Sequence, residues 1–96
     1  MMTKEYILEY LKDNKERFKK DFGVTKIALF GSYARDEQRD DSDIDIAIEV
    51  IKANLKNRFN LQYQLEEYFN KKIDLGYFKT FRTSIKQEVI KDILYA

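Results

Sequence analysis

The chain has 96 residues, and its 18 basic and 17 acidic side chains give a formal net charge of +1. Hydrophobic residues make up 44% of the chain, which is enough for the core of a single small domain over residues 1–96. The near balance of charge excludes a disordered tail and a uniformly basic nucleic-acid-binding surface.

Cysteine and histidine are both absent, and this narrows the chemistry that a site could use. Without cysteine there is no disulfide, thiolate zinc site or cysteine nucleophile, and without histidine there is no Ser-His-Asp triad. A bound metal would therefore be a hard cation held by oxygen, such as Mg²⁺, Mn²⁺ or Ca²⁺. No apolar run approaches the roughly 20 residues of a membrane span and no signal peptide opens the chain, so we expect a cytoplasmic protein with no membrane partner.

The first part of the chain predicts a helix followed by a strand. Thr3 is suited to cap a helix that runs to about Lys20, with Gly23 as its natural stop. Residues 24–30 form a short apolar run rich in β-forming residues, which predicts a mostly buried strand.

The middle of the chain predicts a turn, a loop and a second strand. Gly31-Ser32 interrupts the first strand, and residues 33–35 are suited to a single helical turn. Residues 36–42 predict a polar loop. Residues 44–50 place a large aliphatic side chain at every second position, Ile44, Ile46, Ile48 and Val50, which is typical of a strand with one buried face.

The remaining segments predict helix, strand and helix. Residues 55–69 fit a long helix, residues 72–77 a third strand, and a capping-box pattern at Ser84 opens a last helix. The stripe expected on the long helix comprises Leu55, Phe59, Gln62, Leu65 and Phe69, and that on the last helix Ile85, Val89, Ile90, Ile93 and Leu94. Phe78 and Phe81 are expected to pack under a helix rather than to stack on bases. The order of elements predicts an α/β or α+β fold, a small sheet with helices packed on it.

Acidic residues gather in the centre of the chain. Residues 31–50 contain two basic and seven acidic side chains, whereas residues 12–30 and 71–96 each contain six basic and three acidic ones. An acidic centre between basic flanks suits a site that binds cations and, through them, phosphates. The same run of acidic residues would also be found in a solvated loop that binds nothing.

Three aspartates stand at positions where strands disfavour them. Asp43 and Asp45 should point together away from the isoleucine face of the second strand, with Cα atoms roughly 6.5–7 Å apart. Asp74 opposes Ile73 and Leu75 in the third strand, so it should project onto the face that Asp45 uses. If the two strands are neighbours, Asp45 and Asp74 form a like-charge cross-strand pair, which is destabilising unless a cation lies between them.

Gly31 and Ser32 follow a buried strand and precede a possible helical turn. Such a turn presents backbone N–H groups and a small hydroxyl to an anion, and the missing side chain of Gly31 allows close approach of a phosphate. An ordinary turn would have the same two residues.

Taken together, these residues resemble a known family signature. Gly31-Ser32, ten intervening residues and Asp43-Ile44-Asp45 match the Gly-Ser-x10-Asp-x-Asp pattern of the DNA polymerase β-like nucleotidyltransferase superfamily. The string GSYARDEQRDDSDIDIAIE is similar to the minimal nucleotidyltransferases in particular, and the resemblance covers roughly residues 20–80. It implies a palm-like core with a small mixed sheet flanked by helices.

The resemblance also implies roles for individual residues. Asp43 and Asp45 would bind two Mg²⁺ ions, with Mn²⁺ as a possible substitute, and Asp74 would complete the set and help activate the attacking hydroxyl. Gly31 and Ser32 would hold the β- and γ-phosphates of ATP or another nucleoside triphosphate.

Two neighbouring positions, residues 35 and 36, are not assigned a role by the signature. The family usually has glycine where this chain has Asp36, which bears on the geometry of the loop. Arg35 is suited either to a phosphate of the nucleotide or to pairing with Asp36 or Glu37.

The acceptor is not specified by the motif. Minimal family members are often encoded beside a small helical HEPN-type toxin, so the resemblance implies an antitoxin that transfers AMP from ATP to a tyrosine of that partner. Two alternatives remain: a non-catalytic antitoxin that neutralises its partner by occlusion, and a nucleotidyltransferase acting on a small molecule such as an aminoglycoside. Templated nucleic-acid binding is not expected, because no further domain is present to hold a primer.

Overall fold

The structure is a computed structural model in which residues 2–79 and 92–96 are described. One four-stranded mixed sheet runs through it in the order β3-β2-β1-β4, with β1 antiparallel to both of its neighbours and β2 parallel to β3. The predicted mixed α and β fold with a small sheet is confirmed. In chain order the elements are α1 (Lys4–Asp13), α2 (Lys15–Phe22), β1 (Val24–Phe30), α3 (Gly31–Ala34), β2 (Ile44–Val50), α4 (Leu55–Phe69), β3 (Ile73–Tyr77) and β4 (Leu94–Tyr95).

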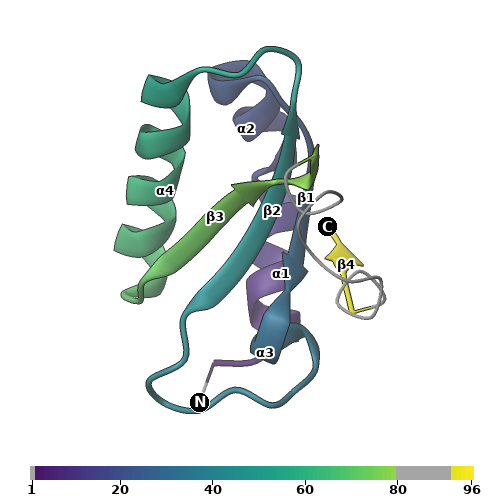
Figure 1. Cartoon of the computed structure of the whole chain (residues 1–96), viewed down its shortest axis with the longest axis vertical. Helices are drawn as coiled ribbons and strands as arrows, with labels where there is room; N and C mark the ends of the chain where they lie inside the picture. Colours follow the sequence, from purple (N-terminus) through teal and green to yellow (C-terminus); the bar gives the residue numbers. More distant parts are fainter. Residues whose placement is uncertain (1, 80–91) are drawn as a thin grey trace.

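The main hydrophobic core lies between one face of the sheet and the helices α1, α2 and α4 (Figure 1). Alternation along β2 directs its three isoleucines to this face, and β1 and β3 add their own apolar positions. The fully buried aliphatic side chains at its centre are Ile7, Leu11, Ile27, Leu29, Ile44, Ile46, Ile48, Leu61, Leu65 and Ile73.

The first helix is divided, in contrast to the prediction. Thr3 caps it as expected, with its Oγ1 accepting from the backbone N–H of Tyr6, and Gly23 ends the segment at a left-handed φ of 70°. The chain bends at Asn14, however, because this side chain bonds locally to the carbonyl of Tyr10 and accepts from Arg17. Such local bonds compete with regular helix geometry.

The buried stripe of α4 differs from the predicted one. Leu65 and Phe69 are buried as expected, but the third buried position is Leu61, which had been overlooked. Leu55 and Phe59 are 63% and 58% exposed, so their assignment to the stripe was wrong. The apolar burial of α4 begins at Leu61 and continues at Leu65 and Phe69, so it does not include the first turn of the helix.

The C-terminal residues contain a strand that the sequence did not reveal. Leu94 pairs with Leu29 at the free edge of β1, and Ile93 before it is not helical, so placing Ile93 and Leu94 in a helix was wrong. Strand pairing of so short a segment depends on the partner edge rather than on its own pattern. The rest of the predicted last helix, from Ser84 to residue 91, and Phe81 lie outside the described residues.

The second face of the sheet carries a smaller apolar cluster, and this face also carries Asp45 and Asp74. Phe78 is buried there, and its ring stacks on that of Tyr95 of β4 with centroids 5.6 Å apart, so within the described residues it packs against strands and not under a helix as predicted. The cluster comprises Ala28, Phe30, Ala47 and Phe78, with Ile93 packed against it. None of the helices in residues 2–79 and 92–96 has both the length and the apolar character needed to cross a membrane.

Candidate active site

The site is built on one row of the sheet. The register places Phe30 opposite Asp45 and Asp45 opposite Asp74, so the last residue of β1 and the two aspartates lie side by side across three strands. Because β2 and β3 are neighbours, the predicted cross-strand pair of carboxylates is formed. Asp74 is exposed and Asp45 is half-buried.

The surroundings of Asp45 oppose its negative charge. Burial is the main cause that raises the pKa of Asp45 to about 6, followed by the charge of Asp74, a hydrogen bond between the two carboxyl groups and the charge of Asp43. Arg35 acts in the opposite direction but is the weakest contributor. The sheet therefore holds the carboxylate of Asp45 against its electrostatic preference, as sites that bind cations do.

Gly31 lies directly against Asp45. Its φ of 75° is in the left-handed region, which strains residues with a side chain. A Cβ added at this position would lie 2.8 Å from Cγ of Asp45, closer than side chains tolerate. Two parts of the sequence signature that are separated by more than ten residues are therefore in contact.

Asp43 occupies a different position from the other two aspartates. It is exposed and precedes β2 by one residue, and its negative charge contributes to the raised pKa of Asp45. Within residues 2–79 and 92–96, no three acidic side chains converge into a ready-made cation cage. The structure thus brings Asp45 and Asp74 together and leaves Asp43 at the rim.

Ser32 and Arg35 belong to the short helix α3 and its end. Ser32 is half-buried, and its carbonyl accepts from the backbone N–H of Glu37. Arg35 is the C-cap residue; its Nε donates to Glu37 at 3.2 Å and its Nη1 lies 3.6 Å from Asp92. The expected pairing of Arg35 with Glu37 is therefore present, and contact of Arg35 with a phosphate stays a prediction.

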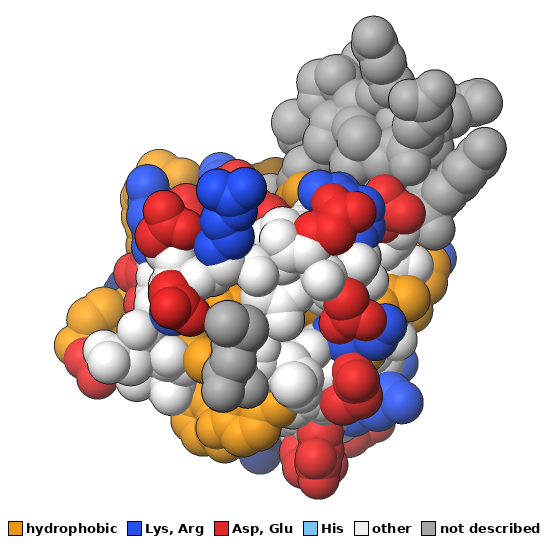
Figure 2. All heavy atoms as spheres, turned by 90° about the horizontal axis from the view of Figure 1, so that it is seen from below, with side chains coloured by type: hydrophobic (Ala, Val, Ile, Leu, Met, Phe, Trp, Pro, Cys, Tyr) orange, Lys and Arg blue, Asp and Glu red, His pale blue; other side chains and the backbone are white. Residues whose placement is uncertain are grey.

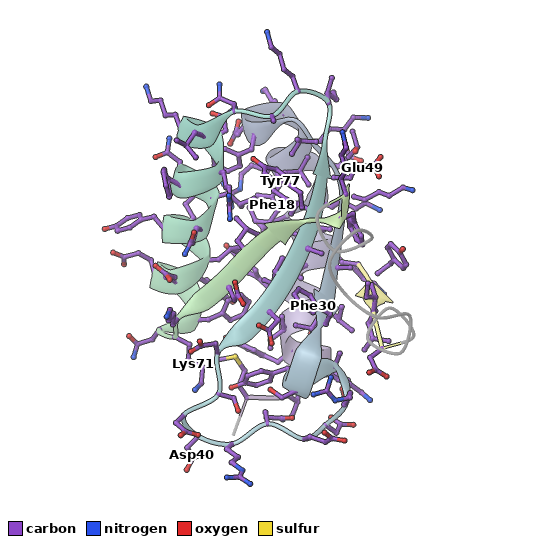
Figure 3. All side chains as sticks on the ribbon, viewed as in Figure 1. Phe18, Phe30, Asp40, Glu49, Lys71 and Tyr77 are labelled. Atoms are coloured by element: carbon purple, nitrogen blue, oxygen red, sulfur yellow. The ribbon has the colours of Figure 1, made fainter. Side chains whose placement is uncertain are left out.

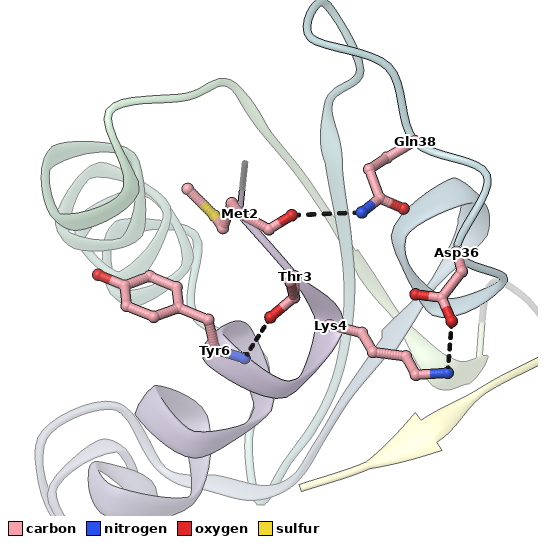
Figure 4. A network of polar contacts seen from close by, with 6 residues as sticks. All are labelled: Met2, Thr3, Lys4, Tyr6, Asp36 and Gln38. Carbon is pink, nitrogen blue, oxygen red and sulfur yellow. Dashed lines mark hydrogen bonds and ion pairs between the residues drawn. The ribbon is translucent and has the colours of Figure 1, made fainter.

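Asp36 adopts the left-handed conformation that the usual family glycine would favour. Its φ is 57°, and its carboxylate pairs with Lys4 at 2.8 Å, on the side of α1 (Figure 4). The loop geometry is therefore retained despite the substitution, since Asp tolerates this region better than most residues.

The loop between α3 and β2 is held by contacts from distant parts of the chain, which local sequence patterns did not predict. Gln38 donates to the carbonyl of Met2 (Figure 4). Lys71 Nζ donates to the carbonyls of Asp40 and Ser42 at 2.6 and 3.3 Å, from the turn after α4 (Figure 3). These contacts fix the entry into β2 next to Asp43.

The surface around this loop is of mixed charge rather than uniformly acidic. Viewed from the end of the molecule that carries the N-terminus, acidic and basic side chains are interspersed (Figure 2). Some of the acidic residues counted in the sequence are paired, as Asp36 is with Lys4 and Glu37 with Arg35.

The donor set fits a hard divalent cation. Asp45 and Asp74 offer only carboxylate oxygens, they face one another across adjacent strands, and Asp43 adds a third carboxylate at the rim. Mg²⁺ and Mn²⁺ prefer such oxygen ligands, and a cation between the two acids would offset their repulsion.

Comparison with known proteins agrees with this geometry. The family model described as "Polymerase beta, Nucleotidyltransferase" matches residues 12–95. A protein of Thermococcus cleftensis named protein adenylyltransferase MntA is 31% identical over 96 residues, covering 99% of this chain and 97% of the relative. A relative from Methanocaldococcus jannaschii is 42% identical over 76 residues, which are 78% of this chain and 88% of that protein.

Solved structures agree as well. A crystal structure described as a toxin–antitoxin with AMP-PNP superposes with a TM-score of 0.68 at 25% identity, over 88% of this chain and 70% of that one. A mutant of the toxin–antitoxin MntA-HpeT gives a TM-score of 0.68 at 26% identity, over 100% of this chain and 72% of that one. Because the family model matches residues 12–95 and the paired aspartates lie beside the glycine of the signature, this chain belongs to the polymerase beta family of nucleotidyltransferases.

Proposed function

We propose that this nucleotidyltransferase transfers AMP from ATP to a tyrosine hydroxyl of a small helical HEPN-type toxin and so acts as its antitoxin. The observation that carries the catalytic part is the pair Asp45 and Asp74, facing one another next to Gly31. The names of the relatives, protein adenylyltransferase and toxin–antitoxin with AMP-PNP, support the choice of AMP and of a protein acceptor.

The carboxylates of Asp45 and Asp74 would hold Mg²⁺ or Mn²⁺, and Asp43 would join them from the rim of the site. We expect two ions, as in other two-metal phosphoryl-transfer sites. Bound cations would supply neutralisation of the triphosphate charge and polarisation of the α-phosphate.

The remaining residues would position the reactants. The backbone of Gly31 would hold the β- and γ-phosphates, and Ser32 would offer its hydroxyl to them. Arg35 would reach a phosphate by leaving Glu37. A carboxylate oxygen of Asp74 would accept the proton of the tyrosine hydroxyl, whose oxygen forms a bond to the α-phosphorus while the bond to the β-phosphate oxygen breaks and pyrophosphate leaves.

The test is transfer of label from α-labelled ATP with Mg²⁺, with a lysate of the native cells as acceptor and an Asp43→Asn, Asp45→Asn double variant as control. We expect label on a tyrosine of one small protein, identified by mass spectrometry, and no label with the variant. Label on a small molecule instead would show that the acceptor is a low-molecular-weight compound and not a protein.

A second arm separates catalysis from occlusion. The proposal is overturned if the double variant neutralises the partner as well as the wild type does and the wild type itself transfers no label although it binds ATP. The protein would then act by occlusion. Loss of neutralisation in a variant that still folds and binds the partner supports the transfer mechanism.

A further inference from the structure

The outer edge of β3 is covered by polar side chains of α4, the helix that runs beside it (Figure 1). Glu66 Oε2 accepts from the backbone N–H of Ile73 at 3.1 Å, and Gln62 Nε2 donates to the carbonyl of Ile73 at 3.0 Å. Arg58 Nη2 donates to the carbonyl of Leu75 at 2.7 Å. Strand edges ordinarily present such groups to solvent or to another strand, and here one helix satisfies them.

These three side chains, which we call the edge ladder, are spaced by four residues along α4. This spacing places them on one side of the helix, one turn apart, so that they match successive positions of the strand. The ladder explains why polar residues recur beside the buried stripe of α4, and why Gln62 falls within the apolar stripe predicted from the sequence.

The ladder brackets Asp74. Its bonds go to Ile73 and Leu75, the residues immediately before and after Asp74, while β2 holds the opposite edge of the strand with Asp45 in register. Two carboxylates directly opposite one another repel, and this repulsion favours separation of the short strand β3 from β2. Bonds from α4 oppose that separation from the other side.

We propose that Glu66, Gln62 and Arg58 are positioning residues that hold Asp74 opposite Asp45. The inference rests on the proposed function, in which Asp74 is a site residue. Residues that orient a ligand without touching the reactants typically change metal affinity or activity by 10–100-fold when they are removed. Glu66 is the member to test, because it alone accepts an N–H of the strand, and an N–H left without an acceptor is destabilising where it is partly buried.

The experiment compares three variants in the full chain. Glu66→Ala removes the acceptor, Glu66→Gln keeps an acceptor oxygen while removing the charge, and Glu67→Ala makes the same change at the exposed neighbouring residue. Hydrogen exchange measured by NMR compares the amide of Ile73 with that of Ile46 in the central strand. Binding of Mn²⁺ is measured by water proton relaxation, and kcat and KM for ATP by transfer of label.

We expect Glu66→Ala to accelerate exchange at Ile73 by at least tenfold relative to Ile46, to weaken Mn²⁺ binding by about 10–100-fold and to lower kcat more than it raises KM. Glu66→Gln should keep the exchange rate at Ile73, the Mn²⁺ affinity and the kinetic constants close to those of the wild type. Glu67→Ala should change none of these quantities. A merely structural role would accelerate both amides together and leave Mn²⁺ binding unchanged in the folded protein. That result, or equal effects of Glu66→Ala and Glu67→Ala, would overturn the proposal.

The same measurements keep the two proposals apart. If the wild type transfers no nucleotide, the proposed function fails, whereas exchange at Ile73 and Mn²⁺ binding still decide whether the ladder positions Asp74. If the wild type is active and Glu66→Ala is equally active with faster exchange at Ile73, only the ladder proposal fails.

Discussion

Gly31 and Asp45 form one structural unit, because a Cβ on residue 31 would meet Cγ of Asp45 at 2.8 Å. The glycine directly follows β1 and the aspartate lies in β2, and the antiparallel register that places Phe30 opposite Asp45 brings them together. The lack of a side chain at residue 31 is thus required by the position of the carboxylate as well as by the backbone.

This relationship predicts a severe defect for Gly31→Ala. The substitution combines the left-handed strain of roughly 1–2 kcal/mol with displacement of Asp45, so we expect a loss of activity of at least 100-fold. The matched control is Gly23→Ala, since Gly23 has a φ of 70° but nothing within 4 Å of an added Cβ. It should share the loss of stability in urea unfolding and keep its activity while folded. Similar activity of the two variants would contradict the contact.

A second prediction concerns the pH dependence of stability without divalent cations. The pKa of Asp45 is about 6 in the folded protein and 3.8 in the unfolded chain, so the folded state binds the proton more tightly. Its ionisation therefore destabilises the fold: the effect is absent below pH 3.8, grows between pH 4 and 6 and is complete above pH 6.

Asp45→Asn should remove this effect. We expect the variant to be more stable than the wild type by on the order of 1 kcal/mol at pH 7, allowing for the screening of a half-buried group, and equally stable near pH 3.5. Urea unfolding in EDTA over this range measures the difference. A variant less stable than the wild type at pH 7 would show that the carboxylate is not held against its preference.

Divalent cations should reverse the order of stability of these two proteins. A cation bound by the folded state alone stabilises it by about 2.7 kcal/mol at a concentration 100 times its Kd. Thermal unfolding at pH 7 should therefore shift upward with Mg²⁺ or Mn²⁺ in the wild type and much less in Asp45→Asn. Sodium chloride of equal ionic strength is the control, and an equal shift by both salts would mean screening rather than a site.

The loop can be tested through Asp36. We expect Asp36→Ala to lower the free energy of unfolding by about 1 kcal/mol, because the φ of 57° stays left-handed. Asp36→Gly should stay within about 0.5 kcal/mol of the wild type, since relief of strain offsets an exposed ion pair. Lys4→Met removes the same ion pair without touching the backbone, and chemical denaturation compares all three. If Asp36→Gly and Asp36→Ala are equally unstable, the left-handed conformation of residue 36 is not the cause of the lower stability of Asp36→Ala.

Short-range patterns predicted much of this protein because they act within a few residues. Alternation of isoleucine with polar residues determined both the extent of β2 and the side on which Asp45 lies. Thr3 and Gly23 marked the ends of the first helical segment, and the Gly-Ser and Asp-x-Asp spacing indicated the family and the carboxylates of the site.

Only the tertiary structure decided which of these pieces meet. The order of strands put β3 beside β2, which turned Asp45 and Asp74 into a facing pair, and the register of β1 placed Gly31 against that pair. The edge ladder joins α4 to the strand that follows it, the contacts of Lys71 join residues 29 and 31 positions apart, and β4 pairs with the edge that β1 offers. Pairing and burial of this kind are set by the whole chain packing around one core, whereas caps, turns and alternation are set by each residue and its near neighbours.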